Sequence, residues 1–115
     1  MTMSSPIPVL CLYRVKPGKE AELVKLLEKH WPALAHAGLV TGEPSRVLRG
    51  QDRSKKTCYV ELFSWKDARA PETAHRSADV MAVWGPMGPL CDGMEFLHTE
   101  QVPMPWDAER PRGAE

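Results

Sequence analysis

The four histidines and four tryptophans are the side chains of this sequence best suited to chemistry. His75 is the strongest candidate for a catalytic residue, because it falls in a predicted helix and its imidazole can exchange a proton near neutral pH. A neutral imidazole there can hydrogen-bond a phenol or quinol, or take its proton at a pH near its own pKa. The competing interpretation is a histidine at a helix surface or in a helix-cap contact.

Aromatic and polar-tipped residues elsewhere are candidates for substrate binding. Trp84 and Trp65 can stack a flat ligand, although such spacing is also typical of core residues. Tyr13, Tyr59 and His98 fall in predicted strands, and their polar tips can point into a cleft. The alternative for all five is ordinary packing.

The sequence gives no sign of a metal or nucleotide cofactor. His30 and His36 are six residues apart, which does not place them on one helix face as metal ligands. Phosphate-binding glycine motifs are absent from the sequence. Cys11, Cys58 and Cys91 are odd in number and far apart, so we expect reduced packing residues rather than a disulfide framework or a zinc site.

Composition narrows the class of protein. The chain has 115 residues, fifteen Lys and Arg against fifteen Asp and Glu, and a hydrophobic fraction of 43%. This length fits a single domain. Its zero formal charge leaves no excess of Lys and Arg of the kind expected in a protein that binds nucleic acid or anionic lipid. No apolar run reaches the length of a membrane span, and the first eight residues do not resemble a signal peptide. We therefore expect a cytoplasmic globular protein without nucleic-acid or membrane partners.

Hydrophobic periodicity predicts the elements that must position these residues. Apolar and β-branched runs predict strands, and leucines spaced by three and four predict an amphipathic helix. The predicted strands are 9–15, 45–51, 57–65 and 94–102, and the helical regions are 19–37 and 67–84. Residues 1–8 should form a flexible N-terminus, 9–102 the domain, and 103–115 a Pro-rich tail.

Local signals set the boundaries within these regions. Pro32 should kink the first helix or split off its last turn. Asp67 is the expected N-cap of the second helical region, and Ser77 can cap a second segment within it. The breaker-rich residues 85–89 predict a bend before the last strand, which can also serve as a pocket lid. Residues 52–56 predict the turn of a β-hairpin.

The predicted order β-α-β-β-α-β defines the fold class. It is the ferredoxin-like α+β pattern, a four-stranded antiparallel sheet with two helices on one face.

The strand 57–65 also predicts an oligomer. Its two faces are both mostly apolar, with Cys58, Val60, Leu62 and Ser64 on one and Tyr59, Glu61, Phe63 and Trp65 on the other. Two helices can cover only one face of the sheet, and a solvent-facing second face should be polar. We therefore predict a two-fold homodimer in which two sheets pack face to face into a barrel.

Four segments resemble a known family. They are V-K-P-G-K-E-A-E-L at 15–23, V-E-L-F-S-W-K-D at 60–67, A-H-R-S at 74–77 and V-W-G-P-M at 83–87. Together they resemble the antibiotic biosynthesis monooxygenase (ABM) domain over residues 9–102. The resemblance implies a dimeric α+β barrel with a pocket between sheet and helices in each subunit, and His75 matches the histidine of the family's A-H pair.

The resemblance covers several activities. Members include cofactor-independent oxygenases of aromatic polyketides, quinol oxygenases, heme-degrading enzymes and proteins without known activity, so the fold is a weak guide to chemistry. Heme degradation is disfavoured, because the predicted first strand lacks the asparagine of that branch. Residues 78–80 read A-D-V where many members carry a second histidine, which argues against a mechanism that needs both.

The sequence therefore favours a cofactor-independent monooxygenase that acts on a small aromatic or quinol-like compound, with His75 as base or hydrogen-bond donor. One alternative is a non-enzymatic dimeric ligand-binding or stress-related domain. Another is a non-redox enzyme on the same barrel, such as an isomerase or decarboxylase.

Overall fold

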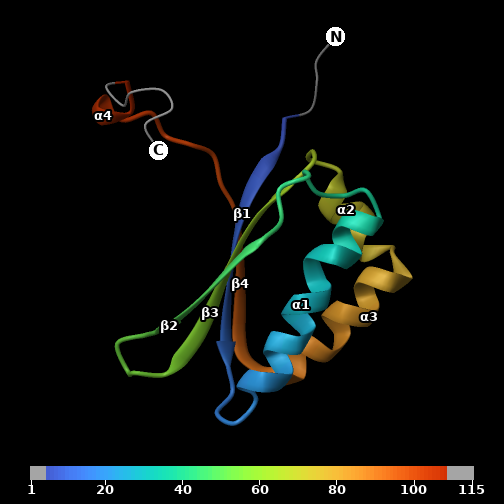
Figure 1. The fold of residues 1–115 in the computed structure, drawn as a ribbon, viewed down its shortest axis with the longest axis vertical. Coiled ribbons are helices and arrows are strands. Elements are labelled where there is room, and N and C mark those ends of the chain that lie inside the picture. Colours follow the sequence, from blue (N-terminus) through green and yellow to red (C-terminus); the bar gives the residue numbers. More distant parts are fainter. Residues whose placement is uncertain (1–4, 109–115) are drawn as a thin grey trace.

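A computed structural model describes residues 5–108. It shows a layer of helices packed against one β-sheet (Figure 1). Its elements are β1 (Ile7–Val15), α1 (Glu20–His36), β2 (Arg46–Gln51), β3 (Thr57–Trp65), α2 (Ala70–His75), α3 (Ala78–Met87), the 3₁₀ turn η1 (Gly88–Leu90), β4 (Cys91–His98) and α4 (Pro105–Ala108). The strands pair antiparallel in the order β2-β3-β1-β4. This is the ferredoxin-like α+β fold that the sequence predicts.

The helix α1 packs its leucine stripe onto the sheet. Leu23, Leu27 and Leu34 are buried, and so is His30, which falls on the same stripe. Gly18 adopts a φ of 85° in the turn before the helix, a conformation that glycine reaches without steric cost. Pro32 does not split the helix. The carbonyl that loses its partner belongs to Glu28 on the exposed side, where water can hydrogen-bond it.

The second helical region divides at Ser77, as the sequence predicts. Its hydroxyl accepts a hydrogen bond from the Val80 amide at 3.3 Å. Asp67 lies before the helix rather than at its N-cap, which is Arg69. Its Oδ1 still accepts hydrogen bonds from the amides of Arg69 and Ala70, at 2.9 and 3.0 Å.

The predicted bend at 85–89 is wrong in its first part. Helix α3 continues through Pro86 to Met87, and only then does the chain tighten into η1. Pro86 deprives only the carbonyl of Ala82, an exposed residue, so solvent can satisfy that group. Strand β4 occupies Cys91–His98 and not the predicted 94–102, because the turn η1 is only three residues long and β4 pairs with β1 from Cys91 onward.

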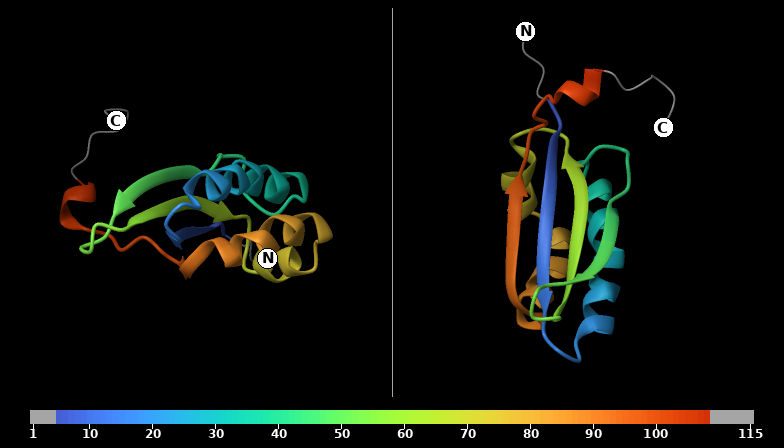
Figure 2. Two further views of the ribbon diagram at one scale, coloured as in Figure 1. Left: turned by 90° about the horizontal axis from the view of Figure 1, so that it is seen from below. Right: turned by 90° about the vertical axis from the view of Figure 1, so that its left-hand side faces the viewer.

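The helices α1, α2 and α3 all cover one face of the sheet, and the other face has no covering element within the described residues (Figure 2). Strand alternation turns Val9, Cys11 and Tyr13 toward the helices, together with the partner residues Tyr59 and Phe63. The opposite face, here called the open face, carries Leu10, Leu12, Leu48, Val60, Leu62 and Leu97.

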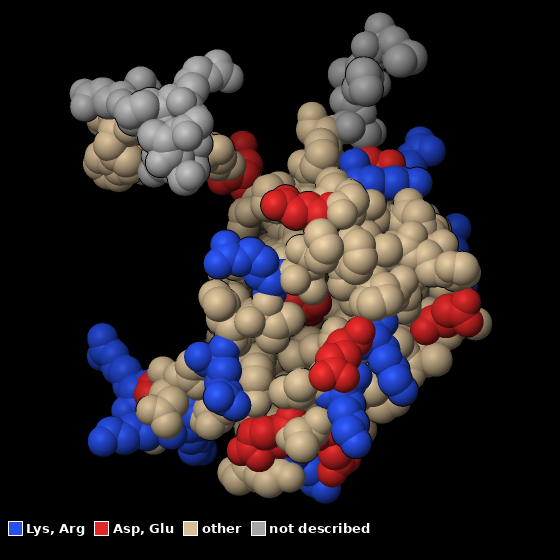
Figure 3. Space-filling model, viewed as in Figure 1, with Lys and Arg blue, Asp and Glu red and all other residues tan. Residues whose placement is uncertain are grey.

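On the face shown in Figure 3, charged residues of both signs lie interspersed. Among the described residues there is no helix of the length and apolar character needed to cross a membrane. The short helix α4 falls inside the tail predicted at 103–115, whose last seven residues lie outside the described range, as do residues 1–4 of the predicted N-terminus.

Candidate functional site

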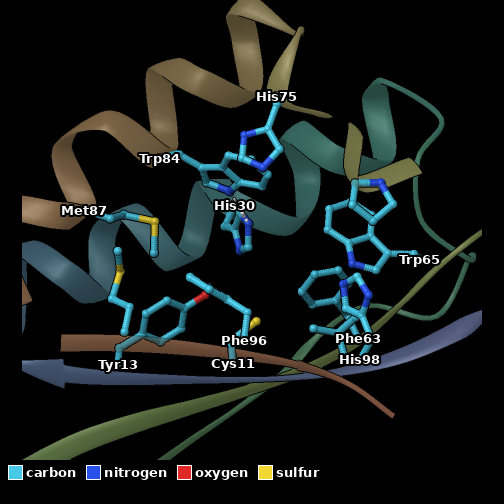
Figure 4. Close-up of a pocket in the computed structure, with 13 residues that line it drawn as sticks. Cys11, Tyr13, His30, Phe63, Trp65, His75, Trp84, Met87, Phe96 and His98 are labelled. Atoms are coloured by element: carbon cyan, nitrogen blue, oxygen red, sulfur yellow. Dashed lines mark hydrogen bonds between the residues drawn. The ribbon is translucent and has the colours of Figure 1, made fainter. Parts of the chain in front are cut away.

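A cavity of about 400 Å³ lies between the sheet and the helices (Figure 4). Strands β1, β3 and β4 form its floor, and α1, α2 and α3 form its roof. The lining residues are Val9, Cys11, Tyr13, His30, Phe63, Trp65, Pro71, His75, Trp84, Met87, Met94, Phe96 and His98. Its volume falls in the range of sites for small organic ligands, and its lining is largely aromatic and apolar.

Five of the six residues predicted for the site line this cavity, namely His75, Trp84, Trp65, Tyr13 and His98. Tyr59 does not. It is buried beside Tyr13, its partner across the sheet, on the side toward β2. The tertiary structure thus gathers one face of β1 and the C-terminal ends of β3 and β4 under the second helical region.

His75 is an exposed residue at the end of α2, on the border of the cavity. Its ring meets the Trp84 indole edge to face, with 4.9 Å between centroids. Within residues 5–108 no hydrogen bond to the ring is found, so both nitrogens are available to a ligand or to water.

Trp84 begins a buried chain of hydrogen bonds that runs from α3 to β1. Its Nε1–H donates to His30 Nε2 at 2.7 Å, and His30 Nδ1 lies 2.8 Å from Glu61 Oε1. The Tyr13 hydroxyl donates to the same Glu61 oxygen at 2.7 Å. His30 and Glu61 are only 2% and 0% exposed, so this polar pair is almost entirely buried.

The donors in this chain fix the tautomer of His30. An indole N–H can only donate, so His30 Nε2 must act as the acceptor. The ring proton is then on Nδ1, which donates to the Glu61 carboxylate. A carboxylate that orients a histidine through Nδ1–H is the arrangement by which proteins prepare Nε2 as a base.

Two neighbouring acidic groups are held in their protonated forms. Burial, reinforced by the Glu61 charge, raises the pKa of the Cys11 thiol to about 12. Burial and then Glu61 raise the pKa of Tyr13 far above its usual range. Since the thiolate is the reactive form of cysteine, Cys11 is unsuited to nucleophilic catalysis. Tyr13 acts as a hydrogen-bond donor, and its proton is already committed to Glu61.

Some buried polar atoms of the described chain lack a protein partner, among them Trp65 Nε1 and Glu61 Oε2. Buried donors and acceptors are rarely left unpaired, because the desolvation cost is then uncompensated. Trp65 is 5% exposed and its side chain lines the cavity, while its Nε1 is buried without a partner among the described residues.

The pair His30–Glu61 was not predicted from the sequence, where His30 was considered only as a metal ligand. Two signals could have found it. Glu61 is the single charged residue on the strand face that also carries Tyr59, Phe63 and Trp65. His30 lies on the leucine stripe of α1, between Leu27 and Leu34. A polar residue on each of two facing apolar surfaces suggests that the two are partners.

The described residues contain no group of three or more His, Cys, Asp or Glu side chains arranged to hold a metal ion. Arg14 forms an exposed ion pair with Glu95 at 3.5 Å and lies on the open face, away from the cavity.

Comparison with protein-family models gave no match, and comparison with the sequences of curated proteins gave none either. Solved structures do resemble the chain. A "putative antibiotic biosynthesis monooxygenase" from Bordetella bronchiseptica is 18% identical, with a TM-score of 0.66 over 85% of this chain and 98% of the other.

Two further structures agree with it. PA3566 from Pseudomonas aeruginosa has a TM-score of 0.68 at 14% identity, over 90% of this chain and all of that one. A structure described as an antibiotic biosynthesis monooxygenase has a TM-score of 0.67 at 12% identity, over 84% and 99% of the two chains. The chain therefore has the fold of solved ABM proteins, as its sequence motifs suggest. At these identities the likeness establishes the fold, and the reaction must be argued from the site.

Proposed function

We propose that this protein is a cofactor-independent monooxygenase that acts on a small aromatic or quinol-like compound. The observation that carries the proposal is the aromatic cavity, which is bordered by His75 and lined by Trp65 and Trp84. A flat ring fits between such walls, and an oxygen substituent can hydrogen-bond the His75 imidazole. His75 serves as base or hydrogen-bond donor to a ligand hydroxyl.

The chemistry needs little from the protein beyond binding and proton removal. An ionised phenol or quinol is electron-rich enough to reduce O₂, and an apolar cavity keeps water away from the radical pair that forms. The cavity supplies the apolar walls, and its histidines supply proton acceptors.

Substitution of His75 should reveal its role in this reaction. With a quinol that the wild-type protein turns over, His75→Gln should lower kcat/KM for O₂ consumption by at least about tenfold, because the ligand loses a hydrogen bond. A loss of about 100-fold or more would identify His75 as the base itself. His36→Gln, an exposed histidine on α1, is the control, and unchanged kinetics in His75→Gln would refute the role.

Ligand binding without turnover is the second candidate function. The observation that favours it is the absence, within the described residues, of any hydrogen bond that would orient the His75 ring. Tight binding of a phenol or quinol panel with no O₂ consumption above the rate in buffer would select this candidate.

We further propose that the protein is a homodimer joined through the open face. Six aliphatic side chains share this face, and two of them, Leu48 and Leu97, are 48% and 51% exposed. An apolar patch of this kind is typical of a subunit interface. Two copies packed face to face would cover it and give the dimeric barrel that the family resemblance implies.

A charge placed on the open face should separate the subunits. Leu12→Glu should weaken the dimer by more than about 100-fold in Kd, since an unpaired carboxylate would be buried between two sheets. Sedimentation equilibrium at micromolar concentration measures this directly. Met81→Glu on α3 is the matched control, because Met81 is a 41% exposed apolar residue away from the open face. A wild-type protein that sediments as a single chain would refute the dimer.

A further inference from the structure

The proton acceptor of the site need not be the exposed histidine. His30 lies at the inner wall of the cavity and meets the structural requirements of a base more closely than His75 does (Figure 4). Its Nδ1–H is held by the buried Glu61 carboxylate, and its Nε2 carries a lone pair. That lone pair accepts the Trp84 indole N–H, so a hydrogen-bond donor already occupies the place where a ligand hydroxyl would bind.

The polar groups next to His30 cannot take a proton from a ligand in its place. Tyr13 on β1 is committed to Glu61, and the Cys11 thiol keeps its proton. Phe63 on β3 packs edge to face on the imidazole, with 5.7 Å between centroids. Within residues 5–108, no lysine, arginine or aspartate lines the cavity, and the carboxylate that contacts His30 is that of Glu61.

We propose that His30 is the catalytic base of this site and that Trp84 holds its Nε2 until a ligand hydroxyl displaces the indole. This proposal rests on the proposed function, and it specifies the ligand as a compound with an acidic phenolic or enolic O–H. The ligand O–H bond breaks and an Nε2–H bond forms, which leaves a ligand anion and an imidazolium paired with Glu61. The net charge of the cavity does not change, because the proton moves between two groups inside it.

The three residues have separate tasks in this step. His30 touches the ligand and takes the proton. Glu61 is a positioning residue, which fixes the tautomer and stabilises the imidazolium by its charge. Trp84 competes with the ligand for Nε2, because its indole N–H donates to that nitrogen when no ligand is bound.

The test uses a chromophore so that it does not depend on turnover. 4-Nitrophenol absorbs differently as a phenol and as a phenolate, and at about pH 6 it is largely protonated in free solution. Wild-type protein at saturation should show the phenolate band of the bound ligand. His30→Gln and Glu61→Gln should reduce the bound phenolate-to-phenol ratio by about tenfold or more, which corresponds to one pKa unit of the ligand. Binding itself is followed by equilibrium dialysis.

Trp84→Phe keeps a ring in the wall and removes the competing N–H, so the phenolate-to-phenol ratio should rise about threefold to tenfold. This variant leaves His30 and Glu61 in place, and it decides the matter if His30→Gln does not fold. His36→Gln is the matched control on the same helix and should keep the wild-type ratio.

The outcomes separate this proposal from the proposed function. Ligand bound as neutral phenol in the wild type, an unchanged ratio in His30→Gln, or a lower ratio in Trp84→Phe would each overturn the assignment of His30. A ratio that depends on His75 and not on His30 would do the same. A His30-dependent phenolate band without O₂ consumption by any quinol would support His30 as the base and refute the monooxygenase. Failure of the wild type to bind the phenol would overturn both.

Discussion

Replacing His30 with leucine is expected to lower the free energy of unfolding by about 3 kcal/mol, because the Glu61 carboxylate would lose its histidine partner in a buried part of the core. Glu61 is 0% exposed, and its Oε2 already lacks a protein partner, so only the Tyr13 hydroxyl would remain to hydrogen-bond it. Urea unfolding followed by circular dichroism measures the change.

The double variant His30→Leu/Glu61→Leu tests whether the loss comes from the stranded charge. It should be more stable than the sum of the two single variants predicts, since it removes the carboxylate along with its partner. His36→Leu makes the same substitution at an exposed position of α1 and should change stability by no more than about 0.5 kcal/mol. A His30→Leu protein as stable as this control would show that the pair contributes nothing to the fold.

A second large effect is expected at alkaline pH, where Cys11 should destabilise the folded protein. The thiol has an ordinary pKa of 9.0, and burial together with Glu61 raises it to about 12 in the fold. Between these values the unfolded chain has lost the proton that the folded chain still binds. Stability must therefore fall as the pH rises, by about 1.4 kcal/mol per pH unit from this group alone.

Cys11→Ala isolates this contribution. The substitution removes the thiol, and its packing cost does not depend on pH, so the variant should lose less stability than the wild type between about pH 9 and about pH 11. Urea unfolding at several pH values, under a reducing agent, gives the two slopes. Burial and then Glu61 are the largest causes that raise the pKa of Tyr13, and both persist in the variant, so folded Tyr13 keeps its proton in both proteins over this pH range. Equal slopes would contradict a buried, protonated thiol.

The two effects have a common origin in one carboxylate on an apolar face. Glu61 holds His30 and Tyr13 and raises the pKa of the neighbouring thiol. Replacing a buried charged pair such as His30 and Glu61 with hydrophobic residues of similar volume is often neutral for stability or increases it. Retaining it beside a cavity is what the proposed role of His30 requires.

The periodicity of the sequence determined most of the fold. Strand alternation in 57–65 and the leucine spacing of α1 indicated which faces are apolar. The order of the elements then indicated the ferredoxin-like fold, in which the helices cover one of the two apolar faces of the sheet. The effect of the two helical prolines was harder to predict. Pro32 was expected to kink or split its helix and Pro86 to belong to a bend, yet both lie in continuous helices, since the carbonyl that each leaves without a partner belongs to an exposed residue.

The sequence also determined the candidate site in outline, because His75, Trp84 and Trp65 fall in segments that carry the family resemblance and all three line the cavity. Only the tertiary structure decided which polar groups work together. His30 and Glu61 are 31 residues apart, and Trp84 is 54 residues from His30. A hydrogen bond depends on distances of about 3 Å, and no spacing along the chain reports such a distance between a helix and the strand beneath it. Periodicity shows which face a residue occupies, whereas packing decides which residue it meets there.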